Sequence, residues 1–104
     1  MIEYEIKRND ISVKICVDVY FVYRTIQYTI ADVLTKQKRK RKWDSVSSSV
    51  RDRWEYRQLD IDKRCEYAKK EFLKYVTEDE LNSALQFAYD SVKPTPQNTV
   101  FRVF

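Results

Sequence analysis

The chain has 104 residues and a net charge of +4, with 43% hydrophobic, 14% aromatic and 35% charged residues. This length and composition favour one globular domain that buries a core without disulfides or metals. Glycine and histidine are both absent, which excludes glycine-dependent phosphate loops, dinucleotide-binding turns and nucleophile elbows. The missing histidine also removes the usual general base near neutral pH and the commonest metal ligand.

The two cysteines, Cys16 and Cys65, are too few for a four-ligand zinc site within one chain. Free cysteine often behaves as a small buried hydrophobe, so we expect two thiols and no disulfide. The N-terminus has no basic segment followed by an apolar stretch, and the apolar region around 15–23 is interrupted by Asp18. These features predict a cytoplasmic protein in a reducing compartment, without a signal peptide or a membrane span.

Residues 2–24 are predicted to form an antiparallel β-hairpin. Apolar and polar side chains alternate over 2–7 and again over 11–18, which is the period of a half-buried strand. Asn9 and Asp10 supply turn chemistry in place of glycine. Beyond Val19 both faces become apolar, so we expect a helix or a second subunit to cover this end of the strand.

Residues 25–43 are predicted to form a helix with a basic extension. Ile26, Ile30, Val33 and Leu34 recur at helical spacing. Six cations then occupy seven positions and an aromatic residue follows, giving the run Lys36, Lys38, Arg39, Lys40, Arg41, Lys42 and Trp43. Because this run carries +6 in a chain of +4, the remaining residues are slightly acidic.

Residues 44–92 are predicted to be helical. Asp44 or Ser45 can cap the first helix, and a break near Asp60 would divide a region that otherwise extends to 76. The segment 77–80 has the form of a capping box and opens the last helix. Residues 93–104 then form a proline-containing linker and a terminal strand.

The predicted fold class is therefore α+β, in a single domain spanning 1–104. An N-terminal antiparallel β-hairpin packs on three to four helices, and the short C-terminal strand can join the sheet.

Charge segregation suggests what the protein binds. Residues 36–57 hold nine cations and three anions, whereas residues 58–90 hold five cations and eight anions. A dense cationic cluster neutralises phosphates and releases their counterions. The leading hypothesis is a small, non-catalytic DNA- or RNA-binding protein. The expected contacts are the run and three arginines after it: Lys36, Lys38, Arg39, Lys40, Arg41, Lys42, Trp43, Arg51, Arg53 and Arg57.

A competing hypothesis is a protein-binding accessory or inhibitor of phage or viral type. It would dock its basic and aromatic surface on an acidic partner. A helix-turn-helix formed by 26–35 and 46–57 would sharpen the DNA-binding hypothesis, but its connection is roughly ten residues, against about 3–4 in that motif. A homodimer is also open, because the hairpin would leave unpaired sheet edges.

Two acidic pairs, Glu3 with Glu5 and Asp60 with Asp62, each lie near a lysine and can in principle bind Mg²⁺. They also fit the polar face of an edge strand and the start of a helix, where solvated carboxylates are expected. With no histidine and no nucleophile–base pair, we predict no enzymatic activity, no metal and no cofactor.

Overall fold

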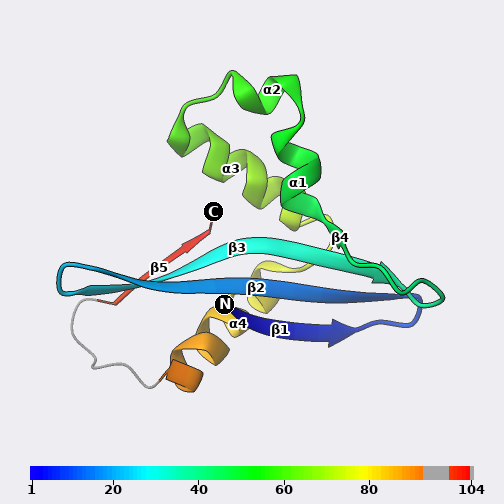
Figure 1. The fold of residues 1–104 in the computed structure, drawn as a ribbon, viewed down its shortest axis with the longest axis horizontal. Helices are drawn as coiled ribbons and strands as arrows, with labels where there is room; N and C mark the ends of the chain where they lie inside the picture. The colour runs from blue at the N-terminus through cyan, green and yellow to red at the C-terminus, as the bar shows by residue number, and fades with distance from the viewer. Residues whose placement is uncertain (93–98, 104) are drawn as a thin grey trace.

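The computed structural model describes residues 1–92 and the backbone of residues 99–103. Three strands form an antiparallel meander, namely β1 (Ile2–Lys7), β2 (Ile11–Val22) and β3 (Thr25–Gln37) (Figure 1). Along the free side of β3, β4 (Asp44–Ser45) pairs antiparallel near one end and β5 (Thr99–Val103) pairs parallel near the other. The α+β class, the N-terminal hairpin and the C-terminal strand in the sheet are thus confirmed.

Four helices follow the first three strands in the described chain: α1 (Val46–Arg51), α2 (Trp54–Arg57), α3 (Ile61–Phe72) and α4 (Glu78–Val92). Figure 1 shows α1, α2 and α3 as one group beyond the β3 edge, which we call the helical group. In contrast, α4 lies across β1, β2 and β3. The region is helical as predicted, although 44–76 is not one continuous helix. The predicted linker at 93–98 lies outside the described residues.

Side-chain caps explain where three of these helices begin. The Ser45 hydroxyl and the Asp60 carboxylate each accept a hydrogen bond, at 3.0 Å, from the backbone N–H three residues later. At α4, the Thr77 N–H donates to Glu80 at 2.9 Å, and the Glu80 N–H donates back to the Thr77 hydroxyl at 3.1 Å. This is a complete capping box, so the caps expected from the sequence are confirmed.

The expectation of a helix over 25–43 is wrong, because this stretch forms β3 and a loop. Cys16 pairs with Asp32 while Val17 pairs with Ile30, so Ala31 is an extra residue in β3, a β-bulge. A bulge shifts the alternation of side chains by one position. The apolar residues on either side of it therefore mimic the spacing of a helical face, although every residue between them is extended.

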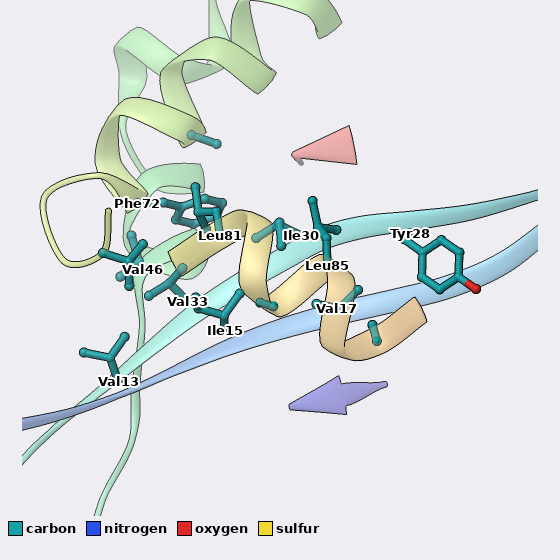
Figure 2. Close-up of a cluster of buried hydrophobic side chains, with 14 of the residues drawn as sticks. Val13, Ile15, Val17, Tyr28, Ile30, Val33, Val46, Phe72, Leu81 and Leu85 are labelled. Atoms are coloured by element: carbon teal, nitrogen blue, oxygen red, sulfur yellow. The ribbon is translucent and has the colours of Figure 1, made fainter. Parts of the chain in front are cut away.

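The core lies between the sheet, α4 and the helical group (Figure 2). Ile15 and Ile30 from the sheet are completely buried, Leu81 and Leu85 from α4 lie against the same face, and Phe72 enters from α3. Each such aliphatic or aromatic side chain contributes roughly 1.5–3 kcal/mol when fully buried. The core face of the sheet thus has helices on it.

Both cysteines are free thiols, as expected. Cys16 is buried and Cys65 is half-buried. Burial raises the pKa of Cys16 to about 11, and the nearby carboxylates of Asp32 and Glu3 add to this shift. Cys16 is therefore protonated and behaves as a small apolar residue at neutral pH.

The end of β2 differs from expectation. No described helix covers its last residues, and Phe21 is 70% exposed while Tyr23, in the turn that follows, is 100% exposed. Figure 1 shows this hairpin end projecting beyond both β1 and α4. Covering by a second subunit remains a prediction.

Candidate nucleic-acid interface

The basic run does not extend a helix; it ends a strand and forms a loop. Lys36 and Gln37 are the last residues of β3, and residues 38–42, here called the basic loop, connect it to β4 through Trp43. The Lys38 N–H donates to the Asp10 carbonyl at 3.1 Å. The basic loop therefore lies beside the β1–β2 turn, at the end of the sheet opposite the β2–β3 hairpin (Figure 1).

All five side chains of the basic loop are exposed, and none forms an ion pair with any residue of 1–92. These residues are Lys38, Arg39, Lys40, Arg41 and Lys42. Between the basic loop and the β1–β2 turn lies an open hollow of about 490 Å³, with Asn9 and Asp10 on one side and Lys38 and Arg39 on the other. An unpaired cationic loop of this kind suits contact with phosphate or with an acidic surface.

Trp43 fixes the end of the basic loop to the sheet. The Nζ atom of Lys14 lies 4.3 Å from the centre of its ring, and that of Lys36 lies 5.3 Å away. Such cation–π contacts are worth about 0.5–1 kcal/mol each at exposed sites. Trp43 is half-buried, so its ring is partly occupied by these two lysines and is not a free platform for stacking on bases.

Lys14 joins this site although sequence reasoning did not include it. It lies on β2, opposite Leu34 in the register, and also forms an ion pair with Glu3 at 3.2 Å. The alternation of apolar and polar residues in the sequence places Lys14 on the polar face of the predicted hairpin. Its proximity to Trp43 depends on the pairing of β2 with β3, which the sequence did not reveal.

The three arginines after the run have other surroundings, because they belong to the helical group. The Arg53 guanidinium donates to the Tyr67 hydroxyl at 3.2 Å and pairs with Glu71 at 2.9 Å. These two partners raise the pKa of Arg53 above its ordinary value. Arg57 Nε donates to the carbonyl of Arg51 at 3.3 Å. The structure therefore gathers six of the expected cations at the end of β3 and uses Arg53 and Arg57 partly to hold the helical group together.

A helix-turn-helix is ruled out by the fold. Its first helix would coincide with β3, and its recognition helix is divided into α1 and α2. Ser47, within the segment that would be the recognition helix, is buried, and its N–H donates to Asp32 at 2.9 Å while its hydroxyl donates to the Ala31 carbonyl at 3.1 Å. The start of α1 is thus joined to β3 and is not available for base contacts.

The acidic pairs hold structural positions. Glu3 pairs with Lys14 on the sheet, and Asp60 caps α3. Within residues 1–92 no three potential metal-ligating side chains come together. Likewise, none of the four helices described above is both long and apolar enough to cross a membrane. No protein-family model matches the chain, and neither a curated protein nor a solved structure shows a significant match to it.

Proposed function

We propose that this protein is a small, non-catalytic nucleic-acid-binding protein that contacts phosphates with its basic loop. The observation that supports it is the run of five consecutive exposed cations without carboxylate partners in residues 1–92. Phosphate contact by such side chains releases condensed counterions, which supplies most of the affinity of sequence-independent binding.

The geometry favours phosphate contact over the reading of bases. A recognition helix normally fills the major groove with its exposed side chains, whereas α1 has six residues and its start is bonded to β3. Trp43 is covered in part by Lys14 and Lys36, so its expected role is to add two ammonium groups beside the basic loop. Binding should therefore depend strongly on salt and weakly on sequence.

The test compares two double variants that remove equal charge. Lys40→Gln with Lys42→Gln changes the basic loop, while Lys63→Gln with Lys70→Gln removes two exposed lysines of α3. Fluorescence anisotropy with a short labelled duplex, single strand and RNA, at about 50 and about 200 mM salt, gives the slope of log K against log salt. This slope is negative, and for duplex DNA the loss of two phosphate contacts should reduce its magnitude by about 2.

The expected result is weaker, less salt-dependent binding for the basic-loop variant and near wild-type binding for the α3 variant. Equal losses in both variants would show that only net charge matters. An absence of binding at the lower salt concentration would overturn the proposal.

A protein partner is the second candidate, and exposed apolar residues of the helical group support it. Trp54 is 73% exposed and Ile61 is 76% exposed. Ile61 also borders an apolar hollow of about 260 Å³ with Tyr56, Arg64 and Cys65. Tryptophan and arginine are enriched among the residues that dominate protein interfaces. In this case the protein is an accessory or inhibitor that binds an acidic partner through cations and aromatics.

Nuclease treatment separates the two candidates. Proteins that this chain captures from a lysate should no longer be captured after nuclease digestion if nucleic acid bridges them to it. A partner that survives digestion, and is lost with Trp54→Ser but not with the α3 lysine variant, would favour the protein-binding function. For either function we propose an intracellular, reducing setting, which the two free thiols support.

A further inference from the structure

The outer half of β2 has an open backbone edge. β1 pairs with β2 only as far as Val17, which lies opposite Ile2, whereas β2 continues to Val22. On the other side of the same hairpin, β5 pairs with β3 over 26–30. Within the described chain, residues 18–22 of β2 therefore have a strand partner on one side only.

This edge carries large apolar side chains. Phe21 is 70% and Tyr23 is 100% exposed, while Tyr20 and Val22 are each 40% exposed. Monomeric proteins usually protect an edge with lysine, proline, a bulge or a very short strand, and residues 19–23 contain none of these. Because successive side chains alternate between faces, apolar groups border the open edge on both faces of the sheet.

We propose that a second copy of this chain pairs with the open edge, antiparallel, about a two-fold axis beside Phe21. An interface of this symmetry is self-complementary, so the same patch serves both copies. Phe21 of each copy then lies opposite the other, and Tyr20 of one copy lies opposite Val22 of the second. The two hairpins form one continuous sheet by strand addition.

Sterics and charge support this register. Met1 precedes the first pair of β1 with β2 and so falls beside Asp18, which leaves Val19 as the first unobstructed position. With Phe21 at the axis, the turn of one copy, which contains Arg24, comes to the end of the other copy's open edge, so that the long Arg24 side chain can reach the Asp18 carboxylate. Neither Asp18 nor Arg24 forms an ion pair within residues 1–92, and the two-fold axis brings the opposite charges together twice.

The available area is sufficient for a weak dimer. With about 200 Å² for an aromatic side chain, the exposed parts of residues 20–23 amount to about 500 Å² per copy. Complete burial of these parts in both copies would remove at most about 1,000 Å² from solvent, which is the lower limit for a specific interface. We therefore expect a weak, reversible monomer–dimer equilibrium that shifts toward the dimer as the protein concentration rises.

Analytical ultracentrifugation over a range of concentrations tests the interface with two substitutions of similarly exposed aromatics. Phe21→Glu places two carboxylates at the axis and should weaken dimerisation at least about tenfold. Trp54→Glu makes the same kind of change on the helical group, where the side chain is 73% exposed, and should leave dimerisation unchanged. A wild-type protein that stays monomeric at hundreds of micromolar, or equal weakening by both variants, would overturn the proposal.

Charge reversal tests the register independently of apolar packing. Asp18→Arg and Arg24→Asp each create two like-charge contacts and should weaken dimerisation several-fold. The double variant restores opposite charges and should return the dissociation constant to within about twofold of wild type. Circular dichroism confirms that each variant is folded, and a double variant no tighter than either single one would exclude this register.

Discussion

Tyr23 adopts a φ of 55° at the first central position of the turn between β2 and β3. This left-handed conformation costs a non-glycine residue roughly 1–2 kcal/mol. Because the second central residue does not share it, the turn has the type II′ pattern, which favours glycine at the first position. In a chain without glycine, a bulky and fully exposed side chain occupies the position instead.

Replacement of Tyr23 by glycine should therefore raise the free energy of unfolding by about 1 kcal/mol. Urea unfolding at submicromolar concentration, where the chain should be monomeric, measures the difference. Arg24→Gly is the matched control, because its φ is already negative and glycine there only increases the entropy of the unfolded chain. A loss of stability with Tyr23→Gly would contradict the expected backbone strain.

Glu71 is the buried carboxylate of the helical group. Arg53 and Lys74 each approach its Oε1 atom at 2.9 Å. Burial raises the pKa of Glu71, but the hydrogen bonds from Lys74 and Arg53 outweigh it and hold the pKa below its ordinary value of 4.5. A carboxyl group whose pKa is lower in the folded than in the unfolded chain stabilises the fold at pH values above its unfolded-state pKa. This stabilisation is lost as the pH falls through the folded-state pKa.

We expect Glu71→Gln to lower the free energy of unfolding by about 2 kcal/mol at neutral pH, and the difference from wild type should shrink below pH 4.5. Urea unfolding between neutral and acidic pH measures this change. Glu66→Gln, at an exposed position on the same helix, should follow the wild-type profile. A difference that stays constant with pH would mean that the Glu71 charge does not contribute.

Among the elements, the bulge in β3 determines where α1 begins. Asp32 follows the extra residue, and its Oδ1 atom accepts hydrogen bonds from the N–H groups of Val33 at 2.7 Å and Ser47 at 2.9 Å. Its other oxygen accepts a hydrogen bond from the Ser45 hydroxyl, which also caps the helix. One carboxylate thus joins a strand, a two-residue strand and a helix.

Asp32→Ala should consequently lower the free energy of unfolding by about 3 kcal/mol, since it leaves several part-buried donors without an acceptor. Asp52→Ala, at the exposed C-terminal cap of the same helix, should change stability by less than about 0.5 kcal/mol. Chemical denaturation of both variants measures the contrast. Similar losses would mean that the Asp32 contacts do not hold α1 on the sheet.

Local signals in the sequence predicted the elements that depend on local physics. The hairpin followed from strict alternation, and the starts of α1, α3 and α4 followed from side chains that bond only three residues away. β3 was missed because its alternation is broken at Ala31, which a local reading cannot distinguish from helical periodicity. Where β5 pairs on β3 depends on long-range register, for which no local signal exists.

At the scale of the whole molecule, the same distinction applies to the candidate site. The exposure of the basic loop was predictable, because five consecutive like charges cannot be buried at a tolerable cost. The ion pair between Arg53 and Glu71 was not predictable, because these residues are brought together only when α3 packs against α1. Cations near each other in the sequence are thus divided between a surface and an internal network.

The two ends of the sheet have opposite chemistry, with the basic loop at one and the aromatic hairpin at the other (Figure 1). The molecule is 42 Å along this direction. Joining two copies through a hairpin overlap of about 17 Å would place their basic loops about 65 Å apart. Since duplex DNA rises about 3.4 Å per base pair, this spacing corresponds to about 20 base pairs.

The affinity of such a dimer for duplex DNA would depend on the length of the duplex. Duplexes of about 25 base pairs should be held by both basic loops and bound more tightly by wild type than by Phe21→Glu, because the second contact becomes intramolecular. Duplexes of about 10 base pairs should bind both proteins equally. Anisotropy titrations across this range of lengths would reveal a threshold near 20 base pairs, and a ratio of affinities independent of length would show that the loops act singly. Because the basic loop and the aromatic hairpin lie at opposite ends of each copy, the dimer would then prefer duplexes of sufficient length, although neither basic loop prefers a sequence.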